Sequence, residues 1–106
     1  MRIFFDHCVP KRLMRQLVSD HDVQTAYQKR WHEKKNGELL SLVEGEFDVF
    51  LTTDQNIRYQ QNLSGRSLRF VVLVASNNEY ETLLPLMPKV LETLDLIQPG
   101  ELQEIS

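Results

Sequence analysis

The chain has 106 residues, of which 42% are hydrophobic and 25% are charged. This length supports one domain with its own core, and this composition is typical of globular proteins and excludes global disorder. The net charge of -3 excludes a general attraction for nucleic acid, so a polyanion would require a local basic patch. We therefore expect a single domain over residues 1–106.

The N-terminal sequence MRIFFDHCVPKR contains only a short apolar run, which Asp6 interrupts and Pro10 follows. It resembles neither a signal peptide nor a membrane span, so we expect a cytoplasmic protein with no membrane partner. The single cysteine, Cys8, has no partner for an intramolecular disulfide, and we interpret it as a buried or half-buried thiol.

Apolar runs and apolar residues at helical spacing alternate along the chain. Short runs without polar alternation, such as residues 3–5 and 68–74, are typical of strands covered on both faces. In the first half of the chain we expect a strand at 3–5, a helix from Pro10 that stops near residues 19–21, a strand at 23–26, a loop in YQKRWHEKKNG and a helix from an Asn36 N-cap to about Gly45. In the second half we expect a strand at 47–52, a loop or short helix in NIRYQQNLSGR, a strand at 68–74, a helix over 79–97 that Pro85 and Pro88 confine or break, and a short edge strand in the tail.

This alternation, without a repeat or a linker, predicts an α/β domain with a mainly parallel sheet of four or five strands in a three-layer α/β/α arrangement. In such sheets, ligands bind outside the carboxyl ends of the strands. Asp6 follows the first strand, Asp54 follows the third, and Glu38 lies in the first turn of the second helix. We expect these three carboxylates to converge in one pocket.

Clustered carboxylates repel one another, and a cation relieves this repulsion. Mg²⁺ or Mn²⁺ suits oxygen ligands and retains waters that phosphate oxygens can replace. Asn56 is a candidate neutral oxygen ligand beside Asp54. A metal held in this way can activate water, so the pattern predicts hydrolysis of a phosphodiester. An Asp after a strand also often caps the next helix, and each acid alone fits that structural role equally well.

Much of the sequence resembles the small PIN-like domains, which are predicted nucleases of prokaryotic toxin–antitoxin systems related to VapC toxins. The segments that carry the resemblance are DHCVP, WHEKKNGELL, FDVFLTTDQNIRYQQNLSGR, the strand LRFVVLV, NEYETLLPLMPKV and PGE. The resemblance implies a ribonuclease that binds magnesium or manganese through acidic residues at the carboxyl edge of the sheet.

Position by position, the resemblance assigns the catalytic and metal-binding roles to Asp6, Glu38 and Asp54. The fuller pattern of the family commonly has four acids, whereas Asn36 and Asn56 stand here where further carboxylates would be expected. Three carboxylates are easier to reconcile with one tightly held ion than with two.

Basic residues near these acids are candidates for contacts to RNA phosphates. The candidates are Arg58, Arg66, Lys11 and Arg12, together with a basic loop from Lys29 to Lys35 that includes Trp31 and His32 beside Tyr27. Charge combined with aromatic stacking is a common way to bind single strands, although charge runs are more often simply solvated. We interpret His7 as a capping or solvent residue rather than a ligand, because the side chain after Asp6 in a strand-to-loop turn is expected to point away from it.

The leading hypothesis is therefore a Mg²⁺- or Mn²⁺-dependent endoribonuclease, the toxin of a toxin–antitoxin pair, with an antitoxin protein as its partner. We also expect a homodimer that buries part of the last helix or the neighbouring first helix, because the apolar residues of the last helix exceed what one face of a small sheet requires. Two alternatives remain open. One is a noncatalytic PIN-like module that binds protein or RNA, and the other is a receiver-like domain phosphorylated on Asp54.

Overall fold

Strands and helices alternate along most of the chain in the computed structural model, which describes residues 1–60, 63 and 65–106 and leaves out the side chains of Arg58 and Gln60. In chain order the elements are β1 (Arg2–Phe5), the 3₁₀ helix η1 (Lys11–Gln16), β2 (Asp22–Thr25), α1 (Ala26–Lys29), α2 (Asn36–Glu46), β3 (Val49–Thr52), α3 (Ile57–Gln60), β4 (Arg69–Leu73), α4 (Tyr80–Leu83), the 3₁₀ helix η2 (Leu84–Leu86), α5 (Met87–Leu94) and β5 (Leu102–Ile105).

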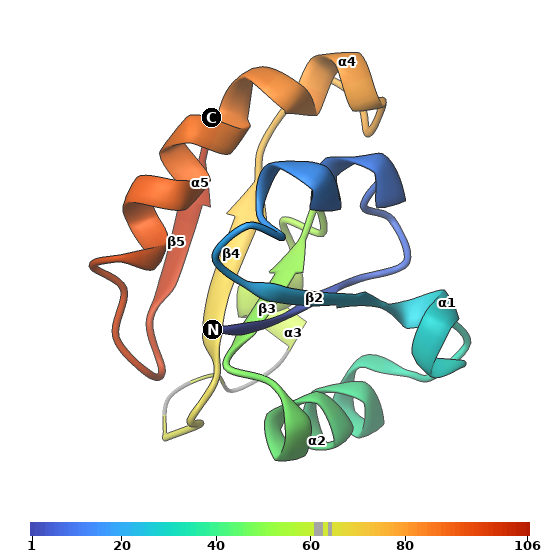
Figure 1. Ribbon diagram of the computed structural model, residues 1–106. Coiled ribbons are helices and arrows are strands. Elements are labelled where there is room, and N and C mark those ends of the chain that lie inside the picture. Colours follow the sequence, from blue (N-terminus) through green and yellow to red (C-terminus); the bar gives the residue numbers. More distant parts are fainter. Residues whose placement is uncertain (61–62, 64) are drawn as a thin grey trace.

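The five strands form one sheet in the order β2-β1-β3-β4-β5, and every neighbouring pair is parallel (Figure 1). Alternate strand residues point to opposite faces, so the sheet has two separate apolar layers. Helices η1, α4 and α5 cover one face, and α2 with residues from α1 and α3 covers the other. The α/β class and the three-layer α/β/α arrangement expected from the sequence are confirmed.

A row of aromatic rings crosses the middle of the sheet beneath α2. The register places Phe4 beside Phe50 and Phe50 beside Phe70. Their ring centroids lie 5.6 Å and 6.1 Å apart, and all three side chains are fully buried. This row fixes the register of the three central strands, because a one-residue slip would move every ring to the opposite face.

The structure corrects several sequence-based predictions about helices. Part of the expected loop after β2 forms the single turn α1, which the sequence did not predict. Helix α2 begins at Asn36 itself and has Lys35 as its N-cap, so the prediction of an Asn36 cap is wrong. The amide of Leu39 donates to the carbonyl oxygen of Lys35 at 2.7 Å, which shows that the first turn begins one residue earlier. The first helix is shorter than expected and has 3₁₀ geometry.

Two other expectations are confirmed. The helix predicted over 79–97 is interrupted by η2, where Pro85 lies, and Pro88 lies in the first turn of α5. The tail forms the edge strand β5, which pairs in parallel with β4. The first half of the segment NIRYQQNLSGR includes α3, whereas Gln61, Asn62 and Ser64 lie outside the described residues.

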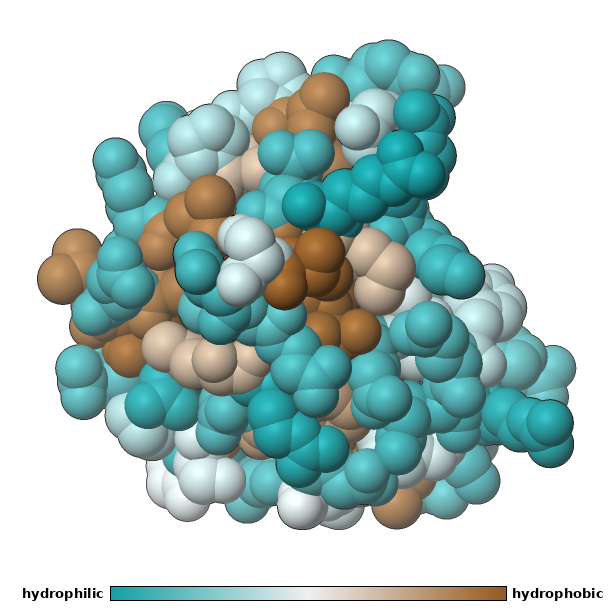
Figure 2. Space-filling view, viewed as in Figure 1, coloured by the Kyte–Doolittle hydropathy of each residue, from teal (hydrophilic) through white to brown (hydrophobic). Residues whose placement is uncertain are grey.

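The apolar residues of the last helical segment mostly pack against the chain's own sheet. Leu83, Met87, Val90 and Leu94 are buried in the layer shared with β1, β3 and β4. Hydrophobic residues also gather on the surface near α5 and the turn after it, at the left of Figure 2. Leu96 is the large exposed hydrophobic side chain of this turn. A homodimer remains a prediction, but the buried residues no longer argue for it.

Among the described residues, no helix is long and apolar enough to cross a membrane.

A matched pair of leucines tests the packing of α5. Leu94 is 1% exposed and Leu96 is 76% exposed, although the two residues are two positions apart. We expect Leu94→Ala to lower the free energy of unfolding by about 2–5 kcal/mol, because it removes buried methyl groups and leaves a cavity. Leu96→Ala should change it by less than about 0.5 kcal/mol. Urea denaturation at several protein concentrations measures both, and a large, concentration-dependent effect of Leu96→Ala would instead place this turn in a dimer interface.

Candidate active site

Asp6 and Asp54 lie at the same edge of the sheet because they follow the neighbouring parallel strands β1 and β3. Phe5 pairs with Leu51, and the backbone N–H of Asp6 extends the ladder by donating to the carbonyl oxygen of Leu51 at 3.0 Å. The hydroxyl of Thr52 donates to Oδ2 of Asp6 at 2.7 Å and accepts the backbone N–H of Asp54 at 3.1 Å. One fully buried hydroxyl thus connects the two acidic positions.

Asp6 is only 5% exposed, and its carboxylate accepts hydrogen bonds at both oxygens. Oδ1 accepts the backbone N–H of His7 at 2.9 Å and lies 3.2 Å from its ring Nδ1. Oδ2 accepts the Thr52 hydroxyl and, at 3.7 Å, the Cys8 thiol. The half-buried thiol agrees with the sequence-based interpretation. The expectation that His7 points away from Asp6 is wrong, because its half-exposed ring turns back onto the carboxylate.

Asp54 is less buried than Asp6 and forms a turn of its own. Its Oδ1 accepts the backbone N–H of Asn56 at 3.0 Å, so an Asx turn starts the segment that leads into α3. Asn56 is exposed. Within the described residues, Oδ2 of Asp54 accepts no hydrogen bond.

Glu38 occupies a different environment. Its side chain is 59% exposed and pairs with Lys34 one turn earlier at 3.2 Å. Glu38 lines a separate pocket with Arg30 and Lys35, and Asp6 is absent from that lining. No three His, Cys, Asp or Glu side chains gather into a group that could hold a metal ion within residues 1–60, 63 and 65–106.

The acids at the edge of the sheet nevertheless suit one kind of metal site. Mg²⁺ is commonly held by one or two carboxylates, while waters and substrate phosphates supply its remaining ligands. Asp6 and Asp54 are two carboxylates at this edge, and the contacts that the Cys8 thiol, the His7 imidazole and the Thr52 hydroxyl make with Asp6 all come from side chains that can rotate away. The donor set therefore fits a partly hydrated divalent ion, and it does not fit a site enclosed by protein ligands alone.

The predicted basic residues lie at different parts of the domain. Lys11 lines a pocket together with Asp6, and Arg12 lies next to it on η1 with its guanidinium 4.1 Å from the ring centre of Tyr80. Arg66 precedes β4 and therefore lies at the amino edge, where it pairs with Glu44 at 3.1 Å. Arg58 lies on α3, and its side chain is outside the described part of the structure.

A pocket of about 530 Å³ opens beside Asp6, between the ends of β1 and β2. Its walls include Pro10 and Lys11 before and in η1, and Thr25 and Tyr27 at the junction of β2 and α1. We call it the Tyr27 pocket. The sequence indicated Lys11 and Tyr27 as candidates for RNA contacts, but it did not predict this pocket, because the pocket wall depends on the unpredicted turn α1.

Comparison with known proteins adds no family. No protein-family model, curated protein or solved structure matches the chain.

The hydroxyl of Thr52 provides a direct test of this arrangement. Thr52→Val keeps the shape of the side chain but removes the donor to the buried carboxylate and the acceptor of the Asp54 N–H. We expect a loss of about 2–3 kcal/mol in the free energy of unfolding, because a hydrogen bond to a charged group is lost and buried polar atoms remain unpaired. Thr52→Ser keeps the hydroxyl and should lose only about 1 kcal/mol for the missing methyl group. Urea denaturation compares the two variants with the wild type, and a Thr52→Val protein as stable as the wild type would show that this hydrogen bond contributes nothing.

Proposed function

We propose that this chain is a metal-dependent ribonuclease of the PIN-like type that hydrolyses phosphodiesters of single-stranded RNA. One observation carries the proposal: Asp6 and Asp54 follow β1 and β3, and the Thr52 hydroxyl connects them. In a parallel sheet of order 2-1-3-4-5, the connections leave β1 and β3 on opposite faces, and ligands bind at that switch point. The reaction itself, metal-dependent hydrolysis of RNA, is inferred from the resemblance of the sequence to PIN-like domains.

The residues at this edge have separate roles in the proposal. Asp6 and Asp54 bind a Mg²⁺ or Mn²⁺ ion, and Asn56 is a candidate for an additional oxygen ligand. When bound, such an ion activates a water and stabilises the charge that develops at phosphorus. Lys11 attracts the RNA backbone next to Asp6. Because Glu38 lines another pocket and pairs with Lys34, the proposal depends on the two aspartates rather than on three acids.

As the resemblance implies, the biological context would be a toxin–antitoxin pair in the cytoplasm. The antitoxin would inhibit the nuclease by covering the Asp6 edge. A homodimer would present two such sites to RNA.

A noncatalytic PIN-like module is the second candidate. The saturation of Asp6 favours it, because both carboxylate oxygens already accept donors from the chain. The absence of a three-acid group among the described residues points in the same direction. Such a module would bind RNA or protein at this edge without cutting it.

A receiver-like phosphoacceptor is the third candidate, and the strand order favours it. The order 2-1-3-4-5 occurs in receiver-type doubly wound domains, and Asp54 follows β3 as the phosphorylated residue would. Two features oppose it. Only Asp6 follows β1, and β4 is followed by Val74, Ala75 and Ser76 rather than by a lysine.

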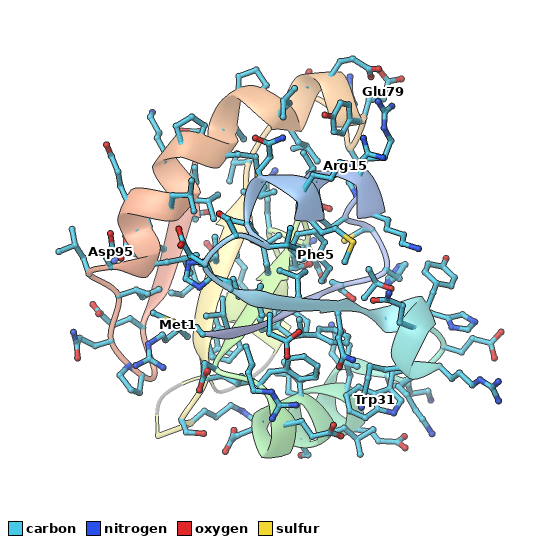
Figure 3. The ribbon with its side chains drawn as sticks, in the orientation of Figure 1. Met1, Phe5, Arg15, Trp31, Glu79 and Asp95 are labelled. Carbon is cyan, nitrogen blue, oxygen red and sulfur yellow. The ribbon has the colours of Figure 1, made fainter. Side chains whose placement is uncertain are left out.

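Manganese titration tests the metal site independently of any substrate. We expect the wild-type protein to bind Mn²⁺ in calorimetry and Asp54→Asn to bind it at least about 10-fold more weakly, since losing a ligand costs no less than losing a supporting contact. Asp95→Asn is the matched control. Asp95 is an exposed acid at the end of α5, and Figure 3 shows it on the opposite side of the domain from Trp31 and α1.

Cleavage assays separate the three candidates. The proposal requires that Mn²⁺ supports cutting of single-stranded RNA by the wild type and by Asp95→Asn, and that EDTA or Asp54→Asn abolishes it. Equal Mn²⁺ affinity of wild type and Asp54→Asn would refute the metal site. RNA binding without cleavage would identify the noncatalytic module, and labelling of Asp54 by acetyl phosphate would identify the receiver-like domain.

A further inference from the structure

The Tyr27 pocket combines an aromatic wall with groups that can form hydrogen bonds. Tyr27 is 60% exposed, and Val9 and Pro10 add apolar surface to the lining. Gln28 also lines the pocket, and its side-chain oxygen accepts the backbone N–H of Thr25 at 2.8 Å. This bond orients the amide, and its nitrogen donates to no acceptor among the described residues. The pocket thus offers a ring face together with a polar donor.

Local contacts hold Tyr27 in place before any ligand binds. The turn α1 has a complete capping box, in which the Thr25 hydroxyl accepts the Gln28 N–H at 3.1 Å and the Gln28 side chain bonds back to Thr25. The ring of His32 stacks on Tyr27 with centroids 4.5 Å apart and planes inclined by 20°. His32 is absent from the pocket lining, so it supports the tyrosine from outside the pocket. A fixed and exposed aromatic ring is a stacking platform rather than a core residue.

The cations beside the pocket differ in their ion pairing from Lys29, Lys34 and Arg66. Lys29, Lys34 and Arg66 are neutralised by ion pairs with Glu46, Glu38 and Glu44. On η1, by contrast, Lys11, Arg12 and Arg15 are all exposed, and none has a carboxylate within 4 Å in the described structure. They line a second hollow, which shares Lys11 with the Tyr27 pocket.

The relative position of these features is visible in two views. In Figure 1, η1 (blue) and α1 lie beside the ends of β1 and β2. Figure 3 shows Arg15 on η1, on the side facing α4, well separated from Trp31 below α1. Because the second hollow starts at Lys11, which also lines the Tyr27 pocket, and continues to Arg12 and Arg15, a chain of phosphates can follow these cations while one base enters the pocket.

We propose that the Tyr27 pocket binds one base of a single-stranded RNA, stacked on Tyr27, while Lys11, Arg12 and Arg15 bind the adjoining phosphates. The inference rests on the proposed function in taking RNA as the ligand. A single strand is required, because a base can enter such a pocket only when it is unpaired. Asp6 lines the same pocket, so the bound nucleotide lies next to the candidate active site.

The test uses an eight-nucleotide single-stranded RNA with one 2-aminopurine, in EDTA so that no cleavage occurs. Stacking on an aromatic ring quenches this base, so we expect quenching on binding to the wild type and to Tyr27→Phe. Tyr27→Ala should abolish the quenching and weaken binding by about 10-fold, within the range measured for base stacking. The same sequence as a duplex should show no quenching on binding to the wild type and no loss of affinity for Tyr27→Ala. Because Tyr27 is exposed, its truncation should leave the thermal unfolding midpoint almost unchanged.

The phosphate contacts are tested by the salt dependence of binding. We expect Lys11→Ala to reduce the slope of log K against log salt concentration by about 0.7, the value for one lost contact on a single strand. Lys89→Ala is the matched control, because Lys89 lies on α5 and bonds the carbonyl oxygen of Ser106. Equal slopes for the two variants would show that Lys11 does not contact the RNA phosphates.

The outcomes distinguish this inference from the proposed function. Quenching that depends on Tyr27, without any Mn²⁺-dependent cleavage, would support the base pocket and refute the nuclease. Cleavage by a protein whose Tyr27→Ala variant binds and quenches like the wild type would support the nuclease and refute the base pocket. Binding of a protein partner to this face, with no quenching of the 2-aminopurine in the RNA, would also refute the base pocket.

Discussion

The buried carboxylate of Asp6 needs hydrogen-bond donors, and meeting this need ties the end of β1 to the end of β3. Moving a charge out of water is costly unless donors replace the lost hydration. At Asp6 the donors are the Thr52 hydroxyl from β3 and three groups from the turn that follows β1. The register that pairs Phe5 with Leu51 brings Thr52 within reach. The geometry of the site therefore depends both on the register of β1 and β3 and on the conformation of the turn after β1.

The sequence predicts the sheet better than the helices, and the reason is physical. Buried parallel strands are continuous apolar runs, so β1, β3 and β4 can be recognised from composition alone. The single turn α1 has only four residues, too few for helical periodicity, and its stability comes from the Thr25–Gln28 capping box. The start of α2 was misplaced by one residue because Asn36 is a good cap by type, whereas the first hydrogen bond is accepted by Lys35.

The candidate site was partly predictable for a related reason. The positions of Asp6 and Asp54 follow from where two strands end, and parallel strands end at one edge. Glu38 was placed from the start of a helix, and the sequence does not show how far that start lies from the sheet. Its pairing with Lys34 and its separate pocket depend on tertiary packing. The turn of His7 onto Asp6 also escaped prediction, because strand alternation no longer applies once the strand has ended.

Ion pairing explains how a chain with a net charge of -3 can present a cationic surface beside its candidate site. Three glutamates neutralise Lys29, Lys34 and Arg66, whereas Lys11, Arg12 and Arg15 of η1 have no carboxylate within 4 Å in the described part of the chain. Asp6 would repel a phosphate there, but the hydrogen bonds that it accepts compensate part of its charge locally. A divalent ion shared with Asp54 would compensate the remainder. The cations of η1 attract anions, and the two aspartates would bind a cation. A phosphodiester suits both, because its negative charge can contact η1 and the bound cation at once.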